Sequence, residues 1–480
     1  MVVLLIVVSA HAQTPSTARG LDPASLQELQ AEIQKLRLES QELRGQVQIL
    51  SEKLNLLLNA TSGSDDKQEA EKRDRLTALT EEQDLLSAKI TDQYQTKVES
   101  GSRYRVQLSG FVLVNVFGTR GSVDSLDLPT LARPQAPGDT TRKFAASARQ
   151  SQLDLKLFGP EWRGAKATGD MSLDFWGGFP ATSTGLSSGL VRLRTANLAI
   201  ETAKTSIVAG QDTPFFSPRS PSSLASSAYP SMSSSGNIWS WIPQVHATHR
   251  FALAKHDTLL VQGGILDPFT GELPAEYERT PTAGERSGVP AVAARFGWTR
   301  QFDDDRQTEF GVGAYRSDQN WGFSRTVNSW ALTADWDFPI AEGLSLSGEL
   351  YRGRAIGGLG AGAAPSVLFQ GSALTSASRV LALDNVGGWS QLKYKPANKI
   401  EFNATFGEDQ PYRPGLRSLL SQRAIDGTSA GRNESGFLNV IYRARSNLLF
   451  SVEYRRLWTY GFYEPKQTAD HFSVTSRIGF

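Results

Sequence analysis

Residues 471–480, with the sequence HFSVTSRIGF, end the chain and decide the fold. Four apolar residues lie on one face at a period of two: Phe472, Val474, Ile478 and Phe480. Polar residues lie on the opposite face: Ser473, Thr475 and Arg477. This pattern predicts either a strand of a membrane β-barrel or the edge strand of a soluble sandwich, because alternation alone does not show which face is buried.

The same period recurs upstream of this strand. Sixteen segments have alternating apolar and polar residues or the composition of a strand. They are 103–118, 145–158, 162–176, 190–202, 204–211, 245–254, 258–266, 290–302, 306–317, 326–338, 343–354, 386–395, 399–408, 435–444, 447–458 and 470–480. An even number of antiparallel strands allows both ends of a closed barrel to lie on the same side of a membrane.

The connections between these segments favour the barrel over the sandwich. Long or moderate connections, such as 119–144, 212–244, 318–325 and 459–469, alternate along the chain with tight turns, such as 255–257 and 396–398. A soluble sandwich does not require its long loops to lie at one end of the sheets, whereas a membrane barrel has long loops on one rim and short turns on the other. We therefore predict an all-β transmembrane barrel of 16 antiparallel strands over residues 101–480.

Composition separates this region from the one before it. The 480-residue chain is 39% hydrophobic with a mean hydropathy of −0.31, which is too polar for a bundle of transmembrane helices. The apolar run in residues 1–12 ends in Ala10-His11-Ala12 and predicts a signal peptide. The chain contains no Cys, so disulfides and cysteine-based sites are excluded.

Residues 13–100 are predicted to form a helical arm and linker. They carry 11 Lys and Arg against 16 Asp and Glu, whereas residues 101–480 carry 39 against 33. Apolar residues fill nine of ten heptad a and d positions: Leu26, Leu29, Ile33, Leu36, Leu43, Val47, Leu50, Leu54 and Leu57. The narrow apolar stripe predicts a coiled coil that joins copies of the chain, in preference to a helix packed on a globular core. A second helical stretch follows and either folds back as a hairpin or continues towards the barrel.

Within a barrel, the face opposite the apolar residues is directed into the lumen. Candidate lumen residues chosen on this basis are Arg192, Arg194, Arg250, Arg295, Lys393, Arg455, Arg477, Asp154 and Glu453. The connection 212–244 is long and rich in Ser and Pro, and it either folds into the lumen or covers the surface. If it folds inward, Arg219 faces the permeating solute. The surplus of Arg favours anions, since the guanidinium binds carboxylate or phosphate through two hydrogen bonds.

Three stretches of the sequence resemble a known family. Ala148-Arg149-Gln150-Ser151-Gln152-Leu153, the run from Gly189 to Ala196, and Val208-Ala209-Gly210-Gln211-Asp212 are similar to the DcaP-like family of trimeric outer-membrane porins. The resemblance implies a sixteen-stranded barrel, a homotrimer and passive uptake of small solutes, with a preference for anions such as carboxylates. The aromatic C-terminal residue resembles the sorting signal of outer-membrane barrels, which implies the barrel-assembly machinery and outer-membrane lipid as partners and a periplasmic arm.

Other functions remain as alternatives. The phosphate-selective porins are a related family, and the coiled coil could instead tether the envelope while the barrel serves as an anchor. An enzyme is not predicted, because the nearest pair of histidines, His246 and His249, would point to opposite faces of a strand. No cofactor or metal is predicted, and no basic stripe indicates nucleic-acid binding.

Overall fold

A computed structural model describes residues 105–179, 189–272, 279–303, 306–412 and 430–480. All of them belong to one unit, Val98–Phe480. The predicted signal peptide, the helical arm and its oligomerisation residues from Leu26 to Leu57 lie outside the described residues. In the described part of the chain, no helix is long and apolar enough to cross a bilayer.

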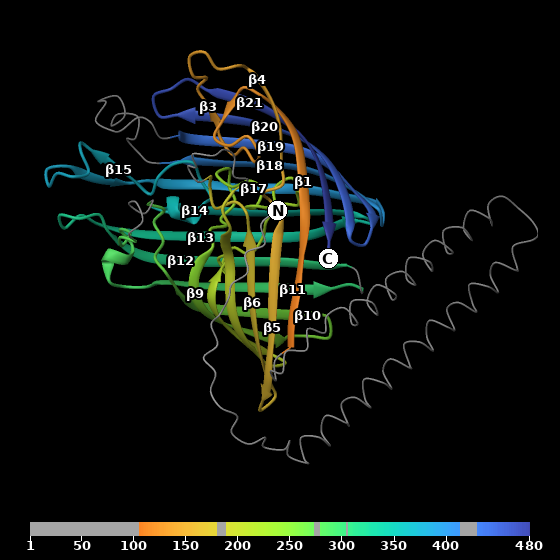
Figure 1. Cartoon of the computed structure of the whole chain (residues 1–480). Coiled ribbons are helices and arrows are strands. Elements are labelled where there is room, and N and C mark those ends of the chain that lie inside the picture. The colour runs from red at the N-terminus through yellow and green to blue at the C-terminus, as the bar shows by residue number, and fades with distance from the viewer. Residues whose placement is uncertain (1–104, 180–188, 273–278, 304–305, 413–429) are drawn as a thin grey trace, which may run out of the picture. The chain divides into compact units, whose positions relative to one another are not determined.

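Strands dominate the described residues (Figure 1). The strands of the main sheet are β1 (Arg105–Arg120), β4 (Arg142–Ser147), β5 (Gln152–Trp162), β6 (Ala165–Asp174), β7 (Arg192–Glu201), β8 (Thr205–Asp212), β9 (Ile242–Ala252), β10 (Asp257–Leu266), β11 (Ala291–Gln301), β12 (Gln307–Asn320), β13 (Thr326–Ala341), β14 (Leu344–Arg354), β17 (Asp384–Ala397), β18 (Ile400–Pro411), β19 (Ala430–Arg445), β20 (Leu448–Gly461) and β21 (Gln467–Gly479). Short strands and turns lie in the connections: β2 (Ser122–Val123), β3 (Ala132–Arg133), β15 (Val367–Gln370), β16 (Arg379–Ala382), and the 3-10 helices η1 (Glu285–Ser287) and η2 (Gly357–Leu359).

The sheet closes on itself as a sixteen-stranded barrel. β4 and β5 both pair with β1, so they are two parts of one strand interrupted at 148–151. On its other edge β1 pairs antiparallel with β21, from Phe111 opposite Gly479 to Arg120 opposite Asp470. Two backbone hydrogen bonds of 3.1 Å between Gly110 and Phe480 complete this seam. The predicted sixteen antiparallel strands are confirmed, and each predicted segment overlaps a strand of the barrel.

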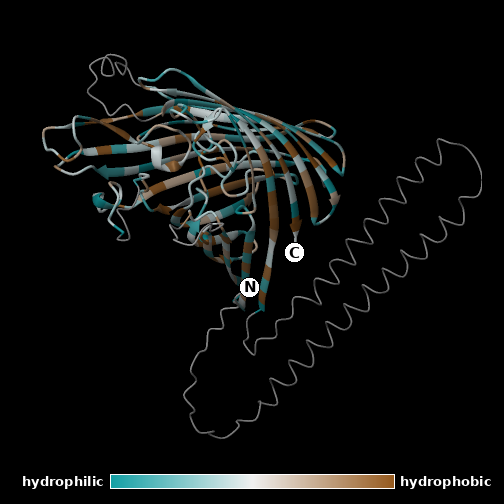
Figure 2. Cartoon of the chain, turned by 45° about the horizontal axis from the view of Figure 1, so that its top comes forward, coloured by the Kyte–Doolittle hydropathy of each residue, from teal (hydrophilic) through white to brown (hydrophobic). Residues whose placement is uncertain are grey.

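Apolar and polar residues alternate along the strands of the wall (Figure 2), and its two faces differ in polarity. On β13, Leu332 is 57% exposed on the outer face, whereas Thr333 and Asp335 on the inner face are 5% and 0% exposed. On β21, Phe472, Val474 and Ile478 are exposed on the outer face, and Phe480 follows them there. An apolar outer face around a closed sheet is the arrangement that a lipid bilayer requires, because no backbone edge is left unpaired in hydrocarbon.

The structure corrects two of the predicted connections. We expected moderate or long connections at 318–325 and 459–469, but only 321–325 and 462–466 separate the strands there. The strands extend further because polar residues continue the pairing. Asp318 lies opposite Asn328, and the side-chain amide of Asn328 donates a 2.6 Å hydrogen bond to the carboxylate of Asp318. The remaining long connections are on the rim where β1 ends, and we call this the long-loop rim.

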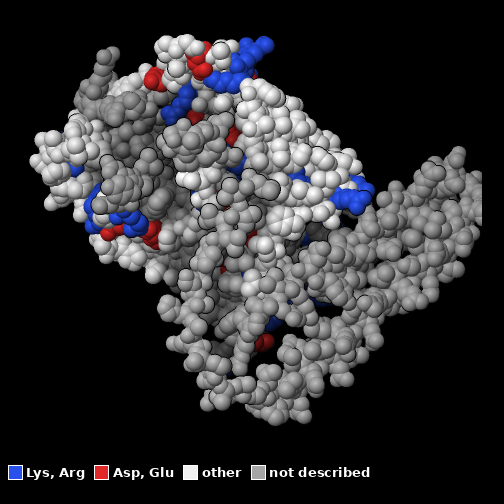
Figure 3. Space-filling view, viewed as in Figure 1, with Lys and Arg blue, Asp and Glu red and all other residues white. Residues whose placement is uncertain are grey.

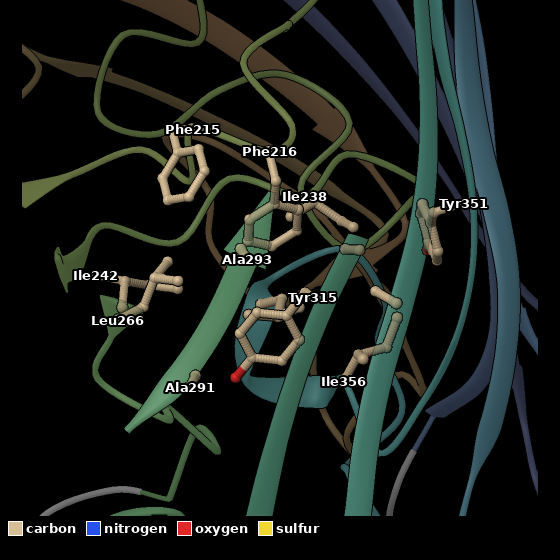
Figure 4. Packing of buried hydrophobic residues seen from close by; sticks show 13 residues of the cluster. Phe215, Phe216, Ile238, Ile242, Leu266, Ala291, Ala293, Tyr315, Tyr351 and Ile356 are labelled. Atoms are coloured by element: carbon tan, nitrogen blue, oxygen red, sulfur yellow. The ribbon is translucent and has the colours of Figure 1, made fainter. Parts of the chain in front are cut away.

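The barrel contains an internal hydrophobic cluster. Phe215, Phe216 and Ile238 come from the connection between β8 and β9, and they pack on Tyr315 of β12 and Ile356 after β14 (Figure 4). The connection between β14 and β17 also contributes Leu359, and its strands β15 and β16, which were not predicted, pair as a hairpin. Part of the lumen is therefore filled by loops that pack on the inner wall.

Candidate constriction of the barrel lumen

The connection at 213–241, which we call the inner loop, lies inside the barrel. Its backbone is held by side chains from several sides of the wall. Gln152 of β5 donates to the Ser227 carbonyl at 2.8 Å, Gln391 of β17 accepts from the Ser222 amide at 3.0 Å, and Thr333 of β13 donates to the Phe216 carbonyl at 2.8 Å. Of the two placements that the sequence allowed for this segment, the structure has the inward one.

The sequence of the inner loop suits this position. Proline lacks a backbone N–H, so the four prolines Pro214, Pro218, Pro221 and Pro230 disfavour hydrogen bonding of the loop to the sheet. Glycines of the wall leave room for the backbone of the loop. A Cβ atom built on Gly313 would collide with the carbonyl oxygen of Phe216, and a Cβ atom built on Gly407 would collide with the carbonyl oxygen of Ser235. Burial raises the pKa of the Tyr229 phenol, which therefore stays protonated and donates to the Leu128 carbonyl at 3.0 Å.

Arg219 attaches the inner loop to an acidic part of the wall. Its guanidinium contacts Asp335 at 3.0 Å and Asp337 at 3.3 Å on β13, and it also forms an ion pair with Glu309 on β12. Arg295 of β11 binds the same Asp335 through two hydrogen bonds, of 2.7 and 3.0 Å. The structure thus brings the predicted residues Arg219 and Arg295 together, and both are engaged by carboxylates.

Arg192 and Arg194 lie side by side on the inner face of β7, as their alternation with Leu193 predicts, and the strand has a β-bulge at Arg194. Ser172 of β6 pairs with Thr195 and Leu173 pairs with Leu193, so Arg194 is an extra residue in its strand. Arg192 forms an ion pair of 2.6 Å with Asp174 and donates to the inner loop at the Ala228 carbonyl. Arg194 donates to the Ser227 carbonyl at 2.7 Å, and both guanidiniums lie over the ring of Trp241, at 5.0 and 4.8 Å.

Arg455 and Glu453 form a buried pair on β20. The Arg455 Nη2 to Glu453 Oε1 distance is 2.7 Å, and the exposed fractions of the two side chains are 4% and 1%. Both side chains also contact the inner loop, since Arg455 donates to the Ser226 hydroxyl at 2.6 Å and Ser223 donates to Glu453 at 2.5 Å. These two predicted lumen residues therefore fix the inner loop to a second part of the wall, five strands along the sheet from β13.

The other predicted lumen residues are less constrained. Lys393 lies 4.0 Å from Glu401, and Asp154 is half-buried on β5. Arg477 lies over the ring of Phe111 at 3.9 Å and, like the exposed Arg250, has no ion pair with any residue that the structure describes. These four side chains remain available to solvent in the lumen.

Sequence reasoning missed further cations on the same side as Arg477. The strand register places Arg105 of β1, Lys156 of β5 and Arg443 of β19 on the inner face, and all three are exposed. Arg105 and Arg443 lie near strand ends, where alternation is weak. Lys156 alternates with Leu155 and Leu157, and this alternation was the signal that could have found it. The structure also shows Arg149 between the rings of Trp176 and Phe179, at 4.0 and 4.1 Å.

An acidic group and a group of cations without ion pairs among the described residues lie on opposite walls. The acidic group Glu309, Asp335 and Asp337 belongs to the ninth and tenth barrel strands, whereas Arg477 and Arg105 belong to the last and the first. Between them lies the inner loop. The inner loop therefore narrows the lumen between the two groups.

Comparison with known proteins agrees with this architecture. No protein-family model matches the sequence, and no curated protein matches it. Among solved structures, the outer membrane channel DcaP of Acinetobacter baumannii matches with a TM-score of 0.58 and 16% identity, over 79% of this chain and 99% of that one. The barrel has the fold of an outer-membrane porin.

Weaker matches come from other porin structures. An anion-selective porin from Comamonas acidovorans has a TM-score of 0.47 and 9% identity, over 79% of this chain and 100% of that one. OmpF of Salmonella typhi has a TM-score of 0.47 and 13% identity, over 78% of this chain and 98% of that one. The resemblance to DcaP-like porins that the sequence suggested is confirmed at the level of the fold.

Proposed function

We propose that the protein is an outer-membrane porin through which small hydrophilic solutes diffuse passively, with a preference for anions such as carboxylates. The observation that carries the proposal is a closed, polar-lined barrel whose lumen is narrowed by an inner loop. Such a barrel offers solutes a wet path across a bilayer, and a loop on the inner wall limits their size.

The balance of free charges supports the preference for anions. On the acidic wall, the carboxylates of Glu309, Asp335 and Asp337 are engaged by Arg219 and Arg295. On the opposite wall, Arg105, Lys156, Arg443 and Arg477 form no ion pair with the described residues. Two carboxylates lie near them, Asp154 and Asp170, and Asp170 lies opposite Lys156 in the strand register. The charges left to interact with solute are mostly positive, and guanidinium groups bind carboxylate or phosphate oxygens strongly.

Four further assignments belong to this proposal. The chain inserts in the outer membrane with the long-loop rim outside, and residues 13–100 form a periplasmic coiled coil that assembles a homotrimer. Residues 1–12 direct export. The exposed apolar face of β21 and Phe480 present the assembly signal to the barrel-assembly machinery.

Planar-bilayer recording tests the proposal. The purified full-length protein should produce large conductance steps, and a salt gradient should give a reversal potential of the sign expected for anion preference. Added dicarboxylates should reduce the current more than phosphate does, which separates this proposal from a phosphate-selective porin. A protein that forms no channels would refute the function, and a cation-selective channel would refute the argument from arginine.

The heptads favour a second, additional role as an envelope tether. Deleting residues 24–98 separates the two roles. Loss of envelope attachment with unchanged conductance would support the tether, and unchanged attachment would reject it.

A further inference from the structure

The outer surface near the long-loop rim has a slot between two phenylalanines. Gly118 of β1 lies opposite Phe472 of β21 on one side and Phe144 of β4 on the other. Both rings point outward, with exposed fractions of 50% and 80%. Because glycine has no side chain, the surface is depressed at Gly118, and a cavity of 280 Å³ lined by Gly118, Phe472 and Arg142 lies there.

A row of arginines borders this slot on the side of the rim. Arg120 of β1 lies two residues beyond Gly118, between Arg142 of β4 and Asp470 of β21. On the far side of Asp470 lies Arg456 of β20. Arg456 forms an ion pair of 3.4 Å with Asp470, and the Tyr454 hydroxyl donates to the same carboxylate at 2.7 Å. Arg120 and Arg142 are exposed and have no ion pair with the described residues, so the row has a surplus of positive charge.

A second apolar cavity continues the slot along the outer wall. It has a volume of 380 Å³ and shares Tyr454 and Phe472 with the first cavity. Ala404 of β18 forms its low point, between Leu392 and Leu438 on the neighbouring strands. The two cavities therefore form one groove, apolar along its length and cationic at one end.

The dimensions of the groove match one leaflet of a bilayer. Four interstrand steps separate Ala404 on β18 from Gly118 on β1, which corresponds to about 19 Å at a strand spacing of about 4.8 Å. With strands tilted by about 40°, the groove rises about 12 Å along the membrane normal, against about 15 Å for half of the hydrocarbon core. The end of the groove at the arginine row is the one near the long-loop rim, because Gly118 lies close to the rim end of β1. The other end lies further from that rim, because Leu392 is in the half of β17 remote from it.

We propose that this groove binds one molecule of a phosphorylated, acylated lipid of the outer leaflet. Its acyl chains lie over Ala404 and Gly118, and its phosphate is held by Arg120 and Arg142. A lipid fits better than a second copy of the chain, since an apolar protein face would bury the two arginines without a counter-ion. In Figure 3, Lys and Arg gather at the top of the view, where Figure 1 places β4, beside a broad uncharged surface.

The test uses the purified full-length protein in neutral detergent, with bisphosphorylated hexa-acyl lipid A as the probe and native mass spectrometry as the readout. We expect saturable binding of one lipid per chain. The double variant Arg120→Ala/Arg142→Ala removes the phosphate partners, and Gly118→Leu fills the slot. The nearest atom to a Cβ built on Gly118 is the Lys143 oxygen at 3.9 Å, so this variant can fold.

Each variant should weaken binding by at least about tenfold, because charge-assisted bonds from arginine to phosphate are about twice as strong as neutral ones and the slot holds the chains. Arg316→Ala is the matched control, since Arg316 is also exposed on the outer face near the rim but lines neither cavity. Single-channel conductance should be unchanged in every variant, which shows that each is folded and keeps this test independent of solute transport.

Three results would overturn the proposal. The first is equal lipid A binding in all variants, and the second is equal binding of the dephosphorylated lipid. The third is that Gly118→Leu converts an oligomer to monomers while lipid binding is unchanged, which would show that a second copy covers the groove. Inorganic phosphate alone should not compete with the lipid, and full competition by phosphate would reduce the site to a free-anion site.

Discussion

Replacing Arg219 by Ala should loosen the inner loop and make the channel less selective for anions. The side chain makes one hydrogen bond with the buried Asp335 and ion pairs with the partly exposed Asp337 and Glu309. A hydrogen bond to a buried charge contributes about 1.5–3 kcal/mol, and each exposed ion pair contributes up to about 1 kcal/mol. Asp335 keeps its two bonds from Arg295, so the loss should be about 2–4 kcal/mol rather than the larger cost of an unpaired buried charge.

This loss can be converted into two measurable effects. A change of about 1.4 kcal/mol alters an equilibrium tenfold. The fraction of time that the inner loop is detached should therefore increase by a factor between about 30 and several hundred, which would appear as current noise and larger conductance steps. Removing one unit charge about 6 Å from a permeating ion in water changes its energy by about 0.7 kcal/mol. Since anions and cations shift in opposite directions, the permeability ratio should fall about tenfold.

The assay is single-channel recording with a salt gradient, and two variants serve as controls. Arg219→Lys retains the charge and should keep the selectivity while losing part of the attachment, because an ammonium cannot reproduce the planar guanidinium. Arg316→Ala removes a charge from the outer face and should change neither property. An Arg219→Ala channel with wild-type noise and wild-type reversal potential would refute the role assigned to this contact.

Further predictions follow from packing and from the assignment of faces. Gly313→Val should displace the inner loop, because the new side chain would collide with the Phe216 carbonyl, and conductance should rise without a change of charge; unchanged single-channel steps would contradict this. Leu332→Arg should lower the free energy of unfolding in urea by about 2–4 kcal/mol more than Leu332→Ala, since arginine is costly at the lipid-facing midplane. Deleting Phe480 should reduce the folded, heat-modifiable fraction in outer-membrane preparations, because its two backbone bonds to Gly110 are lost; an unchanged fraction would argue against a role in closing the barrel.

The strands were predictable because the period of two is a local property of the sequence. On β13 and β21 the apolar residues that suggested a lipid-facing surface are the exposed ones, and the polar residues between them are buried inside. The ends of the strands were less clear, since polar residues such as Asp318 and Asn328 continue the pairing where the apolar pattern has stopped.

The constriction could be predicted only in part, because its contacts join residues far apart in the chain. Arg219 could be named from the composition of its loop, but its partner Asp335 is 116 residues away and on a strand with no local signal of the contact. Arg192 and Arg194 could be selected from their alternation with Leu193, but the bulge at Arg194 could not be predicted. Such a bulge depends on the register between strands, which the pattern within one strand does not show.

The central claim is that polar residues of the wall line a conducting lumen while their neighbours face lipid, and β21 offers a direct test. The chain contains no Cys, so Arg477→Cys and Ile478→Cys each introduce a single thiol on opposite faces of one strand. A charged, water-soluble thiol reagent is added while the current through a planar bilayer is recorded. We expect a stepwise change in conductance for Arg477→Cys and none for Ile478→Cys. Equal responses at the two positions, or a change only at Ile478→Cys, would contradict it.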